Sequence, residues 1–143
     1  MNSAAQPNVW KPSPVTPRRV LVVDDNPGST QVMALMLKKF WGHTVETAGD
    51  GRQALEKAAS FTPEVVLLDI GLPDMDGYSV ARALRAAAGT AEALLVAITG
   101  YSGEQERRKA IEAGFDEHMT KPAAAQDLEL LFKHPRLNPG SER

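Results

Sequence analysis

The chain has 143 residues, a length that fits one compact domain with its own hydrophobic core. Its formal net charge of -2 argues against a nucleic-acid-binding surface built from bulk charge, and the absence of cysteine excludes disulfides, thiolate catalysis and cysteine-ligated zinc. The sequence contains no long apolar run and no secretory signal, so we expect no membrane span and a cytoplasmic location.

The start of the chain, residues 1–17, contains four prolines and no periodic apolar pattern. We therefore expect a disordered or extended leader in which Trp10 is solvated rather than docked. Residues 18–133 alternate short apolar runs with helical patterns and are predicted to form one folded domain. Residues 134–143 are predicted to be a short flexible tail.

Within this domain, the first predicted strand is the apolar run 20–23, and the first helix begins at Pro27 and ends before Gly42. The apolar face of that helix is predicted from residues at helical spacing: Val32, Leu35, Met36 and Phe40. Further strands are predicted at residues 43–48, 65–68, 93–98 and 115–120, and further helices at 50–60, 78–88, 103–113 and 124–133. This alternation indicates an α/β fold with a parallel sheet covered by helices on both faces.

Polar residues follow four of the predicted strands, each at the point where its strand ends: Asp24 and Asp25, Asp69, Thr99, and Lys121. Because ligands of such sheets bind beyond the carboxyl ends of the strands, we expect these side chains to share one cleft. Carboxylates in one cleft repel each other, and a divalent cation such as Mg²⁺, which prefers hard oxygen ligands, relieves that repulsion.

These groups are suited to phosphoryl transfer. The carboxylate of Asp69 can act as a nucleophile and form an acyl phosphate. A metal ion, the ammonium group of Lys121 and the hydroxyl of Thr99 can bind the phosphoryl oxygens and neutralise their charge.

At these positions the sequence resembles the receiver domain of response regulators, which are CheY-like proteins. The matching motifs are VLVVDD at residues 20–25, LLDIGLPDMDG at 67–77, AITG at 97–100 and TKP at 120–122. The resemblance covers residues 18–132 and implies a flavodoxin-like, doubly wound sheet of five parallel strands in the order 2-1-3-4-5 with five helices. It also implies that Asp69 takes a phosphoryl group from a sensor histidine kinase or a histidine phosphotransfer protein.

The metal site implied by the resemblance consists of Asp25, Asp69 and the backbone carbonyl of Gly71, with Asp24 close by or acting through water. The metal would be Mg²⁺. Two further acids, Asp74 and Asp76, lie among turn formers, and we interpret them as turn residues rather than ligands.

The resemblance also implies a cis peptide bond between Lys121 and Pro122. In receivers, the side chain at the position of His118 turns inward when the threonine that corresponds to Thr99 moves toward the phosphoryl group. We therefore predict a switch role for His118. The alternative is a half-exposed strand histidine without a function.

The resemblance implies that two positions, two residues after Asp69 and two residues after Thr99, orient or exclude the water that hydrolyses the acyl phosphate. Gly71 has no side chain that could hold a hydrolytic water, and the bulky Tyr101 could cover the site. We therefore predict slow autodephosphorylation.

We expect a signalling phosphoacceptor that catalyses its own phosphorylation and slow dephosphorylation, rather than an enzyme with a separate substrate. Phosphorylation would change the face formed by the fourth helix, the fifth strand and the fifth helix, which would contact an unknown downstream protein. We expect no direct nucleic-acid contact, and a monomer or a weak dimer.

Two other readings remain open at this point. The first is a pseudo-receiver, an interaction module that is not phosphorylated, although this chain keeps every acid and the lysine. The second is an FMN-binding flavodoxin-like protein, in which Asp24 and Asp25 would repel the phosphate. The motifs also leave open whether the receiver is free-standing or belongs to a hybrid histidine kinase.

Overall fold

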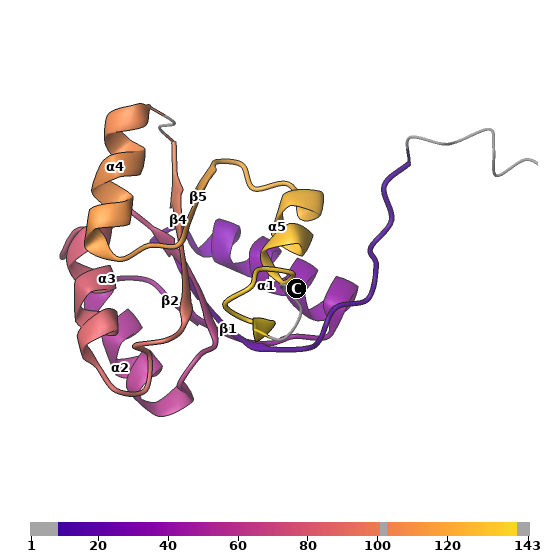
Figure 1. The fold of residues 1–143 in the computed structure, drawn as a ribbon, viewed down its shortest axis with the longest axis horizontal. Helices are drawn as coiled ribbons and strands as arrows, with labels where there is room; N and C mark the ends of the chain where they lie inside the picture. Colours follow the sequence, from indigo (N-terminus) through magenta and orange to yellow (C-terminus); the bar gives the residue numbers. More distant parts are fainter. Residues whose placement is uncertain (1–8, 101–102, 140–143) are drawn as a thin grey trace, which may run out of the picture.

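The computed structural model describes residues 9–100 and 103–139, in which strands and helices alternate along the chain (Figure 1). The strands are β1 (Arg19–Val23), β2 (Thr44–Ala48), β3 (Val65–Asp69), β4 (Leu94–Thr99) and β5 (Glu117–Thr120). The helices are α1 (Pro27–Trp41), α2 (Gly51–Phe61), α3 (Gly77–Ala86), α4 (Glu104–Ala113) and α5 (Ala125–Leu131).

The strands form one parallel sheet in the order β2-β1-β3-β4-β5, which confirms the predicted topology. Helices α2, α3 and α4 cover one face, and α1 and α5 cover the other (Figure 1). None of the helices within the described ranges is long and apolar enough to cross a membrane.

The central strands β3 and β4 are buried along their whole length. Helices cover both of their faces, so every side chain meets a core, and an unbroken apolar run is the expected sequence pattern. The edge strand β2 instead alternates between more and less exposed residues. The burial pattern therefore follows each strand's position in the sheet.

The apolar face predicted for α1 was wrong at three of its four positions; the fourth, Met36, is partly buried against the core. Val32, Leu35 and Phe40 are 61%, 55% and 42% exposed. The residues of α1 that are buried are Thr30, Ala34, Leu37 and Trp41. The helix carries two interleaved apolar stripes, and the sheet contacts the one that ends in the large Trp41 ring.

The expectation that Trp10 is solvated was also wrong. Its ring centroid lies 5.8 Å from that of Phe40 and 6.3 Å from that of Trp41. The Trp10 ring thereby adds an apolar neighbour to the exposed Phe40, whose ring also meets the core residue Trp41 edge-on at 5.5 Å. Residues 1–8 of the predicted leader lie outside the described residues.

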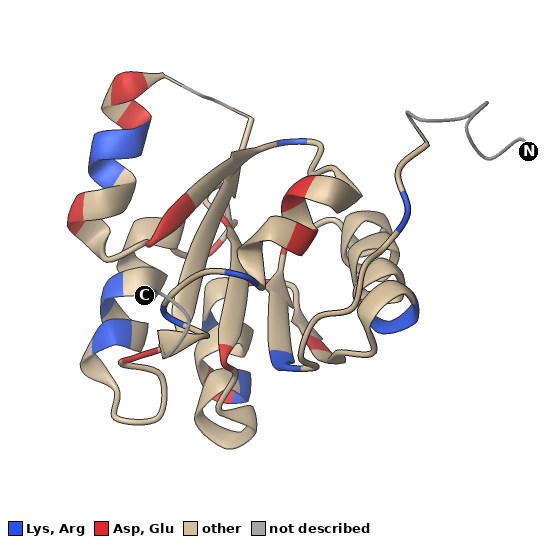
Figure 2. Cartoon of the chain, turned by 45° about the vertical axis from the view of Figure 1, so that its right-hand side comes forward, with Lys and Arg blue, Asp and Glu red and all other residues tan. Residues whose placement is uncertain are grey.

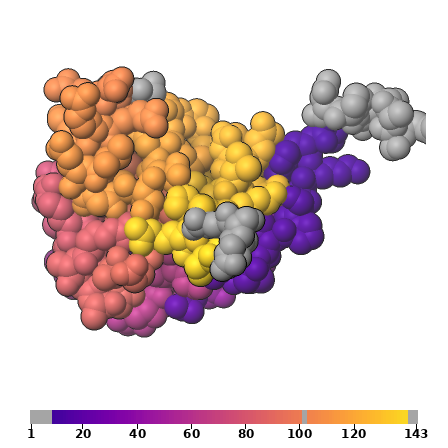
Figure 3. Space-filling model, viewed as in Figure 1, coloured from indigo at the N-terminus to yellow at the C-terminus, as the bar shows by residue number. Residues whose placement is uncertain are grey.

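A buried carboxylate of α5 fixes the same N-terminal segment. Glu129 accepts hydrogen bonds from the Ser13 hydroxyl at 2.6 Å, the Ser13 backbone N–H at 2.7 Å and Trp41 Nε1 at 2.9 Å. These donors, the Ser13 hydroxyl first, hold the pKa of Glu129 below its usual value. The segment consequently lies against α5 on the surface of the molecule (Figure 3).

The C-terminal residues 134–139 pack as well, although the sequence suggested a flexible tail. Leu137 is buried against the core beneath α5, and its carbonyl accepts a hydrogen bond from Arg18 at 2.7 Å. Arg136 pairs with Asp116 at 3.0 Å and with Glu92 at 3.3 Å. These contacts hold the segment against the edge of the sheet where the strands begin.

His43 is only 4% exposed and stacks on Phe132 with ring centroids 4.0 Å apart. Its Nδ1 accepts the backbone N–H of Arg18 at 2.9 Å. Burial, together with the nearby Arg18 charge, lowers the pKa of His43 to about 4 against the weaker opposing effect of Glu64. The folded state therefore strongly favours the neutral imidazole.

The low pKa of His43 predicts a loss of stability in acid. Its contribution is fully present above the ordinary histidine pKa near 6.5 and is lost as the pH falls toward about 4. The full difference corresponds to about 3 kcal/mol. Urea unfolding at several pH values should show a shallower decline between pH 6.5 and 4 for His43→Gln, whose amide oxygen can still accept the Arg18 N–H. An identical decline in both proteins contradicts the prediction.

The docking of Trp10 predicts that Trp10→Ala lowers the free energy of unfolding by about 1–2 kcal/mol, because a half-buried aromatic ring loses its contacts. Chemical denaturation measures the change. Lys11→Ala, at an exposed position of the same segment, is the matched control and should leave stability unchanged. Equal stability of both variants would show that the segment does not dock in solution.

Candidate functional site

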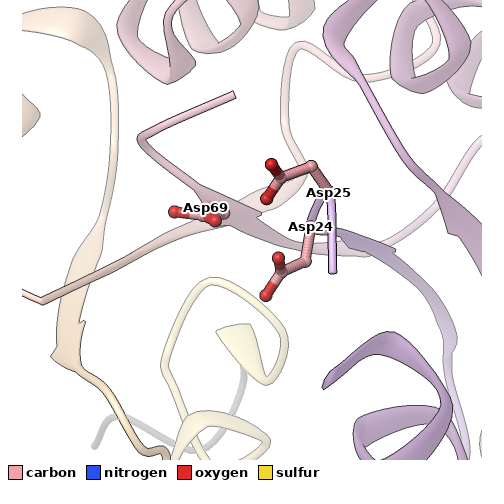
Figure 4. A group of neighbouring side chains, drawn as sticks. All are labelled: Asp24, Asp25 and Asp69. Carbon is pink, nitrogen blue, oxygen red and sulfur yellow. The ribbon is translucent and has the colours of Figure 1, made fainter. Parts of the chain in front are cut away.

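Three carboxylates meet at the carboxyl edge of the sheet. Val23 of β1 lies opposite Leu68 of β3, so the residues that follow Val23 come beside Asp69. One carboxylate oxygen from each of Asp24, Asp25 and Asp69 lies within 4.8 Å of the other two. Figure 4 shows the three side chains converging from the two strand ends. The predicted cleft therefore exists for all three acids.

Lys121 joins this group from the end of β5. Its Nζ lies 3.0 Å from Asp69 Oδ2 and 3.5 Å from Asp24 Oδ2. Its backbone N–H donates to the Thr99 carbonyl at 2.8 Å, which extends the pairing of β4 and β5 by one residue. The peptide bond to Pro122 is cis, as the resemblance implied.

Burial sets the electrostatics of the site. The side chains of Asp24 and Asp69 are only 11% and 10% exposed. Burial raises the pKa of Asp24, although the N–H of Asn26 and the charge of Lys121 work in the opposite direction. Burial also acts to lower the pKa of Lys121, but the hydrogen bond and charge of Asp69, assisted by Asp24, outweigh it and leave that pKa raised.

Thr99 ends β4, is buried, and lines a pocket of about 260 Å³ that opens on one side of Asp69. Gly71 lines the same pocket, and its backbone N–H donates to Asp69 Oδ1 at 3.1 Å. The remaining side chains of the wall include Tyr78 of α3 and Glu106 of α4. Neither of these two was singled out from the sequence, because nothing in the motifs places the first turn of α4 beside Asp69.

A second, larger pocket of about 570 Å³ reaches Asp69 from the opposite face of the sheet. Its walls come from α1 and from the segment after β5, with Val32, Met33 and Ala123 among the apolar residues. Asp69 and Lys121 also line this pocket. Val32, from the exposed side of α1, therefore lies in the same pocket as Asp69.

Gly77 has a steric role behind the site. A Cβ at this position would lie 2.8 Å from the Ile70 Cα and 3.0 Å from the Asp69 carbonyl oxygen, closer than real side chains approach. The Gly77 N–H donates to the Ile70 carbonyl at 2.9 Å. The glycine thus lets α3 begin directly against the backbone that carries Asp69.

Asp74 and Asp76 act as helix caps, in agreement with their interpretation as turn residues. Asp76 accepts the N–H of Ser79 at 2.7 Å and caps α3. Asp74 accepts the N–H groups of Gly51 and Arg52 at 2.8 and 3.0 Å, at the start of α2. Neither belongs to the group of three carboxylates.

His118 is half-buried in β5 and lies beside Arg107, Ile111 and Phe115 under α4. Its Nε2 is buried and has no hydrogen-bond partner among the described residues. The switch role of His118 stays a prediction. Tyr101 lies outside the described residues, so its predicted cover of the site stays a prediction too.

Comparison with known proteins agrees with this geometry. Residues 20–133 match the family described as response regulator receiver domain. The response regulator MprA of Mycolicibacterium vanbaalenii is 38% identical over 78% of this chain and 47% of its own length. The probable transcriptional regulatory protein TcrX of Mycobacterium tuberculosis is 36% identical over 82% of this chain and 49% of its own length. The chain thus spans about half the length of these curated relatives.

Solved structures give the same result. A CheY-like receiver domain protein from Methanospirillum hungatei superposes with a TM-score of 0.77 at 26% identity, covering 87% of this chain and 96% of that one. The chemotaxis response regulator CheY4 of Vibrio cholerae also gives 0.77, at 27% identity, covering 82% and 98%. The fold, the carboxylate group and the sequence match lead to one conclusion: the chain belongs to the response regulator receiver domain family.

Proposed function

We propose that Asp69 is the phosphoacceptor of this receiver, in a Mg²⁺-dependent reaction with a phosphohistidine donor. The observation that carries the proposal is the convergence of three carboxylates within 4.8 Å beside a lysine 3.0 Å from Asp69. Asp24 and Asp69 are largely buried, and like charges held together there lower stability, so the group is a candidate for a task that needs the charge.

In the proposed reaction, a carboxylate oxygen of Asp69 attacks the donor phosphorus. An O–P bond forms, the N–P bond of the phosphohistidine breaks, and its electron pair returns to the imidazole nitrogen. Lys121 then exchanges its contact with the carboxylate for one with a phosphoryl oxygen. Thr99, which lines the smaller pocket together with Asp69, contributes its hydroxyl to another phosphoryl oxygen.

Asp24, Asp25 and Asp69 fit a hard divalent cation, because they supply carboxylate oxygens at mutual distances that one ion can span. Mg²⁺ would add positive charge for the phosphoryl oxygens. The proximity of Gly71 to Asp69 is compatible with the proposed carbonyl ligand. Burial of Asp24 makes its charged form costly, and a cation in this position compensates that cost.

We assign the larger pocket to the donor. It borders both the nucleophile and Lys121, so the imidazole that delivers the phosphoryl group can reach Asp69 through it. The exposed Val32 and Leu35 on α1 offer an apolar contact surface beside it, which suits the side of a helix of a sensor histidine kinase or a histidine phosphotransfer protein.

The output we propose is a population shift in α4, β5 and α5, with Thr99 and His118 as the moving parts. Helix α4 buries only Ala110 and Ala113, so it has few apolar anchors. Low local stability suits an element that changes position. The protein then acts as a signalling phosphoacceptor that catalyses its own modification, not as an enzyme with a separate substrate.

The phosphoacceptor prediction is tested by intact mass after incubation with acetyl phosphate. We expect a gain of about 80 Da that requires Mg²⁺ and is absent in Asp69→Asn. A receiver of known activity serves as the positive control. If that control gains mass and this protein does not, the alternative of a non-phosphorylated interaction module is favoured.

A second prediction concerns the metal alone. Mg²⁺ at about ten times its dissociation constant should raise the melting temperature by about 3–6 °C, because it binds the folded state and relieves the carboxylate repulsion. Asp25→Asn should lose most of this shift. Glu56→Gln, at an exposed position of α2, removes the same charge and should keep the shift. Equal shifts in both variants would place the ion elsewhere.

A further inference from the structure

Tyr78 and Glu106 connect α3 to α4 at the rim of the smaller pocket. The Tyr78 hydroxyl donates to Glu106 Oε1 at 3.2 Å. Both side chains are half-buried, and both line the pocket that also contains Asp69 and Thr99. The proposed nucleophile therefore shares its pocket with a carboxylate that is absent from the metal-binding group.

A simpler reading of Glu106 is that it complements the helix dipole, since it lies in the first turn of α4. Glu104 lies in the same turn and serves that purpose equally well. Its side chain is 87% exposed, however, and it pairs with Arg108 at 3.9 Å, outside the pocket. Figure 2 shows these acidic residues at the start of α4 and basic residues in the next turn. The dipole therefore explains an acid in this turn but not its placement beside Asp69.

The position of the Tyr78 ring is restrained from two sides. Besides its hydrogen bond to Glu106, the ring meets Phe115 edge-on at 6.4 Å and packs against the core formed by α2, α3 and α4. Burial and then the Glu106 carboxylate raise the pKa of Tyr78, so the hydroxyl keeps the proton that it donates. Tyr78 thus holds Glu106 toward the pocket instead of letting it extend into solvent.

A phosphoryl group that reaches Asp69 brings negative charge into this smaller pocket, whichever pocket its donor approaches through, because Asp69 and Thr99 both line it. Within the described part of the site, the cation paired with the carboxylates is Lys121, which contacts Asp24 and Asp69. Lys121 lines the larger pocket, whereas Glu106 lines the smaller one. In a partly buried pocket the charge of Glu106 is poorly screened and opposes the entry of an anion.

We propose that Glu106, positioned by Tyr78, is an electrostatic gate that slows the entry of anionic phosphodonors at Asp69. The proposal rests on the phosphoacceptor function proposed above. In this proposal Glu106 acts through its charge and is not a catalytic residue, and Tyr78 is the residue that positions it. Once the phosphoryl group is in place, its repulsion of Glu106 acts directly on the first turn of α4, so the same pair links the modification to that helix.

The test compares initial rates of phosphorylation by acetyl phosphate, measured by intact mass. Glu106→Gln keeps the shape of the side chain and an acceptor for Tyr78 but removes the charge. It should raise the rate at subsaturating donor by about threefold or more at an ionic strength of about 0.01 M, and the gain should vanish at about 1 M. The rate at saturating donor should change much less, because the gate acts on entry.

Glu104→Gln is the matched control, since it removes the same charge from the same helical turn outside the pocket, and it should behave like the wild type. Tyr78→Phe, which releases Glu106, should show a smaller rise, and the double variant should not exceed Glu106→Gln. Far-ultraviolet circular dichroism checks that each variant is folded.

The outcomes separate the two proposals. If the wild type is phosphorylated at Asp69 but Glu106→Gln matches Glu104→Gln at both salt concentrations, the gate is wrong and the phosphoacceptor function stands. A rise in Glu106→Gln that does not depend on salt also overturns the gate, since it would come from altered packing of α4. If the wild type is not phosphorylated while a control receiver is, both proposals fail.

Discussion

The contact between Lys121 and Asp69 is the interaction on which the site depends. Asp24 and Asp69 are almost fully buried, and like charges in such a place are destabilising without compensation. Lys121 supplies part of that compensation from β5, the last strand of the sheet. Because the two carboxylates come from β1 and β3 and the lysine from β5, which pairs with β4, the site exists only when these four strands pair in the correct register.

In the proposed function, the two pockets would divide the tasks of the site between the faces of the sheet. The larger one lies under α1, has mostly apolar walls and reaches Asp69, and we assigned it to the donor. The smaller one lies toward α3 and α4, where Thr99 and Glu106 flank Asp69. A phosphoryl group bound to Asp69 would thus arrive across one face and act on helices of the other. This arrangement gives a physical route from modification to surface change.

The described segments that flank the sheet, residues 9–18 and 132–139, make contacts away from the site. The N-terminal segment is fixed through Glu129 and Trp10, and the C-terminal segment through Arg136 and Leu137. Ser13 of the N-terminal segment donates two hydrogen bonds to Glu129 of α5, so a movement of α5 in the proposed switch would act on these two bonds.

The sequence by itself determined the α/β class, the strand and helix positions and the group Asp24, Asp25, Asp69, Thr99 and Lys121, because each depends on a local apolar run and the residue that ends it. Only the tertiary structure decided which stripe of α1 is buried, since both stripes are apolar and the choice depends on what the sheet presents. It also decided the docking of Trp10, the burial of His43 and the approach of Glu106 to Asp69. These contacts join residues far apart in the chain, and no local pattern encodes them.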